Sequence, residues 1–436
     1  MSRRKEFGMY LAVFAGLLAL LWLMLVFAAA IPNAALRGNM EQSALSYREK
    51  EGFSFENGSR WNAISDNYAD AILLNVSWNM GEGNPLVSSL DTKYYDGEAF
   101  GESIGLYLAV TDENTVPNTD YTRYWHGTAV FVRLMHLVTD VNGMKLAGMA
   151  AAVLFLLITA LLLVKRGHYA LTGVLLLSVA SVQIWNIRLS MEYQPAFIIC
   201  FLFCPMYLWL EKRTDVGLVS LSVAGGVLIA FFDFLTTETV ALLLPLILVV
   251  TVRAEENRLG SLRDNVWLMV KCGIAWLLAY AGTFFVKWTA VSAVTGENKY
   301  RAAVSSVGER IGGSLQGEGS DQFLVRVPEA VAANLSALFG GESRVDMMRM
   351  FAGLAISVLV LGSLFYLFHK KRSGTAAVLL ALLGSVVIVR YAVLNNHSYL
   401  HSFFTYRALV SPIMALLAGM SLSMHFPIPK KKGAHR

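Results

Sequence analysis

The stretch MYLAVFAGLLALLWLMLVFAAA at residues 9–30 contains no charged side chain. A run of about 20 apolar residues can cross the hydrocarbon core of a bilayer as a helix, because a helical backbone satisfies its own hydrogen bonds. Arg3, Arg4 and Lys5 precede the run, as basic residues precede a signal peptide. The apolar segment is about twice as long as that of a cleaved signal peptide. We therefore expect a retained transmembrane helix in residues 1–30.

Similar apolar runs recur along the 436-residue chain, of which 56% is hydrophobic and 15% is charged. This composition is too apolar for a soluble globular protein of this size. The sequence predicts an all-α polytopic membrane protein with about ten transmembrane helices. The first lies in residues 1–30, helices 2–7 in 146–290 and helices 8–10 in 350–424. The expected spans are 9–30, 146–164, 169–187, 195–210, 216–232, 237–252, 266–290, 350–368, 375–394 and 405–424.

Basic residues predict the orientation of these spans, because Lys and Arg near short loops are retained on the cytoplasmic side. With ten spans, the basic clusters all fall on one face of the membrane. We therefore expect both termini, including a basic tail at 425–436, in the cytoplasm of a cell bounded by a bacterial plasma membrane. Topology also explains the net charge of +5, and no nucleic-acid-binding motif is present. The clusters are Arg3-Arg4-Lys5, Lys165-Arg166, Lys212-Arg213, Arg253 with Arg258 and Arg263, Lys370-Lys371-Arg372 and Lys430-Lys431-Lys432.

Two long connections, residues 31–145 and 291–349, fall on the opposite, extracytoplasmic side. Long loops in a compact protein are usually functional or disordered. In the first loop, Ser65-Asp66-Asn67 is typical of a helix N-cap, and the following helix is expected to reach Met80 before Gly81 and Pro85 end it. Residues 121–138 are amphipathic and rich in aromatic residues, which favours a place near the outer membrane interface. The first loop is therefore expected to carry amphipathic helices.

Acidic residues near the outer face are candidates for catalysis and substrate binding. Asp66 and Asp70 are four residues apart, so a helix would place them on one face, and one of them could act as a general base. The alternative is that Asp66 only caps the helix and Asp70 is solvated. Three further acids lie at the outer ends of helices, where ionisable groups tend to face a polar cavity or else pair with basic neighbours. They are Glu192, Asp233 and Glu238.

Three basic residues lie near the outer ends of their helices: Lys287, Arg390 and Arg407. The guanidinium group suits planar, bidentate recognition of phosphate. These cations are therefore candidates to bind the phosphate of a lipid-linked donor. The alternative is that the long side chains extend to the lipid headgroups without a specific ligand.

The short outer segment 395–407 is dense in polar and aromatic side chains. Aromatic rings can pack against pyranose rings, while Asn396, His397 and His401 can form directional hydrogen bonds. An aromatic belt at the membrane interface is the competing interpretation. Two histidines without a third ligand do not make a metal motif. We therefore predict no metal site and no cofactor. A divalent cation stays an open alternative that no sequence motif supports.

The segment Asp66-Asn-Tyr68-Ala-Asp70 through Gly81-Glu-Gly-Asn-Pro85 resembles a pattern of the GT-C superfamily, membrane glycosyltransferases that use polyprenyl-phosphate sugar donors. That pattern is an acidic residue, Tyr-Ala, a helix and Gly-x-x-x-Pro after the first span. The architecture is also similar to that of the superfamily: one span, then a large outer loop with acidic residues, then many further spans. The resemblance implies that Asp66 first, or Asp70 second, is the catalytic base, and that basic residues at outer helix ends bind phosphate. The chain departs from the family's usual adjacent acidic pair.

The function that this resemblance implies is transfer of a sugar from a polyprenyl-phosphate donor to an envelope acceptor on the extracytoplasmic side, as in polysaccharide biosynthesis. The acceptor would be a glycan, a lipid or a protein, and membrane lipids would be the other partners. One alternative is a secondary transporter or flippase of a lipid-linked or small polar substrate. This alternative predicts paired, interrupted helices and ionisable groups near mid-membrane. Another is a non-catalytic membrane protein of envelope assembly.

Overall fold

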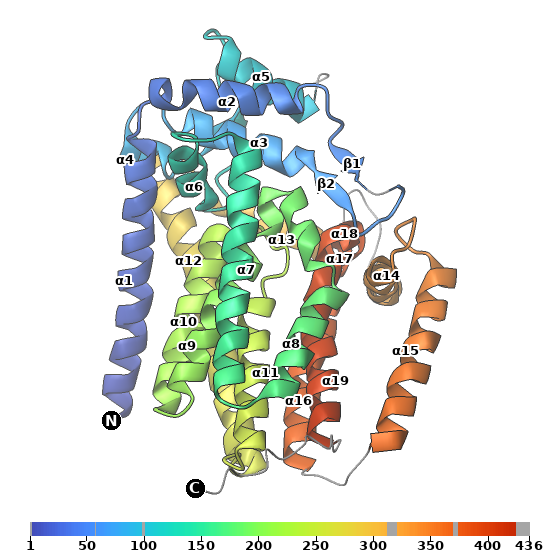
Figure 1. The fold of residues 1–436 in the computed structure, drawn as a ribbon. Coiled ribbons are helices and arrows are strands. Elements are labelled where there is room, and N and C mark those ends of the chain that lie inside the picture. The colour runs from blue at the N-terminus through green and yellow to red at the C-terminus, as the bar shows by residue number, and fades with distance from the viewer. Residues whose placement is uncertain (1, 57, 98–100, 312–320, 369–373, 424–436) are drawn as a thin grey trace, which may run out of the picture.

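The computed structural model describes residues 2–56, 58–97, 101–311, 321–368 and 374–423. Figure 1 shows a bundle of long helices that carries a group of shorter elements on one end. We call this group, residues 33–140, the head. Helix α1 begins and helix α19 ends at the opposite end of the bundle (Figure 1). The basic clusters at 370–372 and 430–432 and the tail at 425–436 lie outside the described residues.

Eight segments of the described chain are long and apolar enough to cross a membrane. Helices α8 (Tyr169–Ser181) and α11 (Val240–Glu255) occupy the two other predicted ranges but are shorter. The prediction of a helical polytopic membrane protein is therefore confirmed, while the count of ten spans stays a prediction. The long segments contain α1 (Arg3–Ala29), α7 (Val141–Lys165), η3 (Met191–Tyr193) with α9 (Pro195–Leu210), α10 (Asp215–Phe232), α12 (Leu262–Thr295), α15 (Met347–Phe368), α16 (Gly374–Val393), and α18 (Ser402–Thr405) with η4 (Tyr406–Leu409) and α19 (Val410–Ser423).

Helix ends differ from the expected ranges where local backbone geometry intervenes. The expected span 169–187 is too long, because Gln183 adopts a left-handed conformation with φ of 47° and a 3-10 helix, η2 (Ile184–Leu189), follows. The expected span 266–290 is too short, because Ser261 caps helix α12 and Gly296 ends it with φ of 72°. Both differences come from single residues with turn or cap geometry, which hydropathy does not report.

The head contains the elements that follow α1 and two small antiparallel sheets, β1 with β2 and β3 with β4. Asp66 accepts a hydrogen bond from the Ala69 amide at 2.8 Å and caps helix α3, which ends at Asn79. The predicted N-cap is therefore confirmed. The head elements are α2 (Asn33–Tyr47), β1 (Phe53–Phe55), β2 (Ile64–Asp66), α3 (Asn67–Asn79), α4 (Pro85–Ser88), β3 (Lys93–Tyr94), α5 (Gly101–Thr111), β4 (Thr119–Asp120) and α6 (Thr128–Met135).

Arg133 on α6 holds the head against the bundle. Its buried guanidinium donates hydrogen bonds to the carbonyl groups of Ala28 at the end of α1, Ile31 and Ser77 on α3. A buried guanidinium needs several acceptors to offset its desolvation. Helix α6 covers only part of the predicted amphipathic stretch 121–138, and residues 121–127 form an irregular segment that faces the bundle. Residues 121–127 thus form a packed loop, and the expected position near the outer membrane interface stays a prediction.

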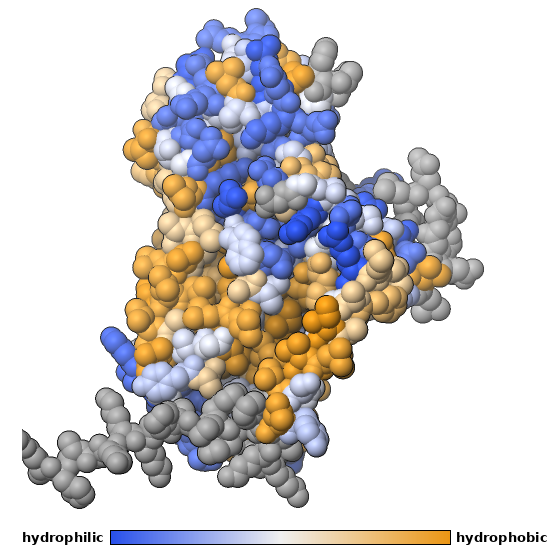
Figure 2. All heavy atoms as spheres, turned by 45° about the vertical axis from the view of Figure 1, so that its right-hand side comes forward, coloured by the Kyte–Doolittle hydropathy of each residue, from blue (hydrophilic) through white to orange (hydrophobic). Residues whose placement is uncertain are grey.

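The second long connection also contains helices, α13 (Tyr300–Arg310) and α14 (Asp321–Leu338), which lie against α17 (Asn395–Leu400). Helix α15 stands at the edge of the bundle beside α14 (Figure 1). Figure 2 shows a hydrophilic head above a broad belt of hydrophobic side chains on the bundle. This distribution fits a bundle that lies in a bilayer and a head that lies in water.

Candidate functional site

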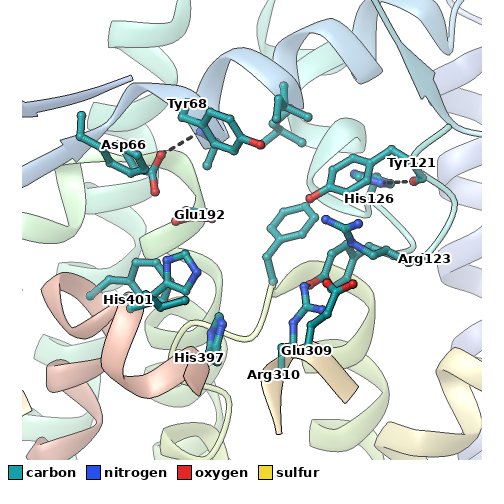
Figure 3. A pocket seen from close by; sticks show the side chains of 18 of the residues that line it. Asp66, Tyr68, Tyr121, Arg123, His126, Glu192, Glu309, Arg310, His397 and His401 are labelled. Carbon is teal, nitrogen blue, oxygen red and sulfur yellow. Dashed lines mark hydrogen bonds between the residues drawn. The ribbon is translucent and has the colours of Figure 1, made fainter. Parts of the chain in front are cut away.

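A cavity of about 290 Å³ lies where the head meets the bundle. Its lining comes from β1, α3, the irregular segment at 121–126, η3, α13, α17 and α18. Figure 3 shows Asp66, Glu192 and His401 on one side of the cavity and Arg123 and Arg310 on the other. Glu309 also lines the cavity, beside Arg310 (Figure 3). Segments distant in sequence thus bring Asp66 and Glu192 to one side of the pocket and two guanidinium groups to the other.

Asp66 enters the cavity from the junction of β2 and α3. One carboxylate oxygen caps α3 through the Ala69 amide. Burial raises the pKa of Asp66 to about 7, while hydrogen bonds from the Ala69 amide and with Glu192 act in the opposite direction. A carboxyl group with a pKa near the working pH is well matched to accept a proton in catalysis.

Asp70 lies behind the cavity and is fully buried. It accepts hydrogen bonds from the Tyr47 hydroxyl, the Ser190 hydroxyl and the Met191 amide, each at 2.8 Å. It also forms an ion pair with the Lys145 ammonium at 2.6 Å. These contacts fix the turn that carries Glu192 into the cavity. Asp70 and Asp66 therefore do not share a face, because Asp66 caps the helix from outside it, and Asp70 is not solvated.

Two arginines that the sequence analysis did not single out line the cavity. Arg123 lies over the rings of Tyr121 and Tyr124, at 4.5 and 5.5 Å from their centroids. Arg310 donates a hydrogen bond to the Tyr124 hydroxyl at 2.7 Å. Within the described part of the chain, neither arginine forms an ion pair. Arg123 could have been found from the sequence, because it is a basic residue inside the aromatic run at 121–126.

The three cations predicted to bind phosphate lie elsewhere. The Lys287 ammonium is fully buried and donates to the Leu90 carbonyl at 2.6 Å. Arg390 forms a buried ion pair with Glu238 at 2.8 Å. The Arg407 guanidinium is buried between the rings of Tyr193 and Tyr406, at 4.7 and 4.9 Å. None of the three lines the cavity, although Arg390 borders the groove described below.

The remaining candidates divide in the same way. Asn396, His397 and His401 line the cavity, as Glu192 does. His401 stacks on Phe404, and burial lowers its pKa to about 4, so this imidazole is neutral at physiological pH. Asp233 instead accepts hydrogen bonds from the amide and hydroxyl of Thr236 and closes a turn. Glu238 forms its ion pair with Arg390 and does not line the cavity.

The backbone is strained at two places beside the cavity. His126, which lines the cavity, has φ of 54°, and Leu235, next to the lining residue Phe234, has φ of 67°. The Leu235 carbonyl accepts hydrogen bonds from Arg390 and His397, which hold it in place. Positive φ costs free energy for residues other than glycine, and such residues cluster at functional sites. The strain supports a functional role for this cavity.

An apolar groove of about 930 Å³ adjoins the cavity and runs along α11, α12, α13 and α16. Leucine, valine and aromatic side chains dominate its lining, among them Leu242 and Trp276. Arg123, Tyr124 and Arg310 belong to the lining of both the groove and the cavity. A ligand with a long apolar chain and an anionic head could therefore place its chain in the groove and its head between the arginines.

Among the residues that the structure describes, no three His, Cys, Asp or Glu side chains are grouped as metal ligands. Comparisons with protein-family models, with curated proteins and with solved structures gave no match.

Proposed function

We propose that this protein is a membrane glycosyltransferase of the GT-C type that transfers a sugar from a polyprenyl-phosphate donor to an envelope acceptor. The observation that carries the proposal is the continuity between the cavity and the long apolar groove. The cavity has Asp66 and Glu192 on one side, the Asp66 wall, and Arg123 and Arg310 on the other, the arginine wall. A polyprenyl-phosphate sugar has the matching parts in the same order: an apolar chain, an anionic phosphate and a polar sugar. The head would face outward, and the basic end of the bundle would face the cytoplasm.

The arginines support binding of the donor phosphate. Arg123 and Arg310 stand at the junction of groove and cavity, where the phosphate would lie if the chain fills the groove. Guanidinium groups bind phosphate oxygens through charge-assisted hydrogen bonds. In this proposal Arg123 and Arg310 replace Lys287, Arg390 and Arg407 as the donor-phosphate residues, since none of the latter three lines the cavity.

The chemistry would be an inverting displacement. The acceptor hydroxyl gives its proton to the ionised Asp66 carboxylate while its oxygen forms a bond to the anomeric carbon of the donor. The bond from that carbon to the phosphate oxygen breaks, and the electron pair leaves with the polyprenyl phosphate. Arg123 and Arg310 would stabilise the charge that grows on the departing phosphate. The opposite placement of Asp66 and the arginines (Figure 3) suits attack and departure on opposite sides of the sugar.

The test is donor turnover by the full-length protein in lipid nanodiscs. A panel of radiolabelled polyprenyl-phosphate sugars would be supplied together with an envelope extract as acceptor, and release of polyprenyl phosphate would be followed. Replacing Asp66 by Asn removes the proton acceptor, so we expect turnover to fall by about a hundredfold to ten-thousandfold. Donor binding should persist in this variant.

Asp112→Asn is the matched control, because Asp112 is an exposed aspartate in the head that does not line the cavity. It should turn the donor over at the wild-type rate. Full activity of Asp66→Asn would reject the assigned base. Failure of every donor to bind the wild type would reject the glycosyltransferase and favour a transport or assembly role.

A further inference from the structure

A row of aromatic rings runs from the cavity mouth across the surface of the head. We call it the aromatic strip; it consists of Phe53, Phe55, Trp61 and Tyr68 and rests on the buried ring of Phe403. Phe53 and Phe55 are 44% and 47% exposed. An exposed apolar patch of this kind usually marks a binding surface.

Strand register connects the strip to Asp66. Strand β1 pairs with β2 in antiparallel fashion, so Phe53 lies directly opposite Asp66 and Phe55 opposite Ile64. Directly opposite residues project their side chains to the same side of a sheet. Phe53 and Phe55 are two positions apart and therefore share this side. The strip thus begins beside the proposed base and leads away from it.

The rings have fixed positions. Phe53 stacks on Tyr68 with an interplanar angle of 17°, and it meets Phe403 edge to face at a centroid distance of 5.5 Å. The Trp61 indole donates a hydrogen bond to the Ser402 hydroxyl at 2.8 Å. The Arg344 guanidinium lies 5.5 Å from the Trp61 ring centroid. The strip therefore offers rigid aromatic faces with a cationic hydrogen-bond donor beside them.

We infer that the aromatic strip binds an oligosaccharide, so that the acceptor of the proposed transfer is a glycan of several sugar units. This inference rests on the proposed function, because it takes the cavity as the place where the acceptor hydroxyl reacts. A sugar ring has a face of C–H groups that packs on the electron-rich face of an aromatic ring, and its hydroxyl groups can bond to Arg344. Successive rings of the strip would hold successive sugar units.

The position of the strip distinguishes it from a membrane anchor. Strand β1 belongs to the hydrophilic head and lies above α14 and α18, on the side away from the bundle (Figure 1). The strip also reaches the Asp66 wall of the cavity, whereas the apolar groove joins the arginine wall. An acceptor on the strip and a donor in the groove would therefore approach the cavity from different sides.

The test measures binding of the full-length protein, in fluorescent nanodiscs and without donor, to an array of immobilised neutral, acidic and amino oligosaccharides. We expect the wild type and Asp66→Asn to bind the same oligosaccharides. Phe55→Ala should raise the dissociation constant roughly tenfold, because about half of the burial energy of one phenyl ring is lost. Phe131→Ala is the matched control, because Phe131 is 48% exposed but lies on α6. It should bind as the wild type does.

Two further variants separate stacking from simple apolar contact. Phe55→Trp should retain the wild-type dissociation constant, and Phe55→Leu should raise it as Phe55→Ala does. Equal binding by Phe55→Leu and the wild type, or no binding of the wild type to any oligosaccharide, would overturn the inference. Because the array contains no donor, its result is independent of the turnover of polyprenyl-phosphate sugars, which tests the proposed function.

Discussion

The charged side chains named in the cavity differ in ion pairing from Asp70 and Glu238 immediately behind it. In the cavity, Asp66, Arg123 and Arg310 have no ion-pair partner within the described residues. Behind it, Asp70 pairs with Lys145 at 2.6 Å, and Glu238 pairs with Arg390 at 2.8 Å. Asp70 also accepts a hydrogen bond from the Met191 amide and so holds the backbone next to Glu192, another residue of the cavity.

This difference assigns roles. Asp66 is buried without an ion-pair partner in the described part of the chain, whereas Arg123 and Arg310 are half-buried. A buried charge without a partner costs free energy, and proteins retain such strain where activity requires it. A buried pair that loses one member leaves the other unpaired, which destabilises the fold. Changes in the cavity should therefore affect activity with little loss of stability, and changes behind it should affect stability first.

The largest stability effect should follow Asp70→Asn. The substitution leaves the Lys145 ammonium without its counter-charge, and loss of one partner of a buried pair costs about 3–5 kcal/mol of unfolding free energy. Thermal unfolding in nanodiscs should show a clear decrease in Tm. Asp66→Asn serves as the comparison. Since burial raises the pKa of Asp66 to about 7, the folded state disfavours its charged form, and its neutral replacement should not lower the Tm above that pH. Equal losses in both variants would contradict the division of roles.

The next effect should appear in kcat/KM when the arginine wall is changed. Arg310→Gln and Arg123→Gln remove charged hydrogen-bond donors worth about 1.5–3 kcal/mol each, so we expect roughly a 10- to 150-fold decrease for each variant. Arg301→Gln is the matched control, because Arg301 is exposed on the same helix as Arg310. Unchanged donor turnover in both cavity variants would return the phosphate role to other residues.

The smallest effect should be the pH dependence. Asp66 must be ionised to accept a proton, and its pKa of about 7 means that donor turnover should rise about tenfold between pH 6 and pH 8. The transition belongs to Asp66 and Glu192 together, because the two carboxyl groups interact. Burial lowers the pKa of His401 to about 4 and that of His126 to about 3, so neither imidazole titrates in this range. A rate that falls as pH rises from 6 to 8 would exclude Asp66 as the base.

Some of the candidate site could be predicted from local patterns. Asp66 has the cap signature in its own sequence, and Asn396, His397 and His401 stand close together in one short segment, so all four line the cavity. Arg390 and Arg407 show where local reasoning fails. The sequence correctly places both arginines near a helix end. The rotation of each helix, which the sequence does not give, points Arg390 at Glu238 and Arg407 at two tyrosine rings.

The sequence by itself determined that this chain forms membrane-spanning helices, because a bilayer requires long apolar runs with internally bonded backbones. It also determined the cap at Asp66, because capping is a contact between near neighbours. Only the tertiary structure decided that Asp70 forms an ion pair with Lys145, whereas Asp66 lines the cavity without an ion-pair partner among the described residues. It alone placed Arg123 and Arg310, which are 187 residues apart, at one junction of cavity and groove. Contacts over such distances depend on how the helices and the head pack together, and no local periodicity records that packing.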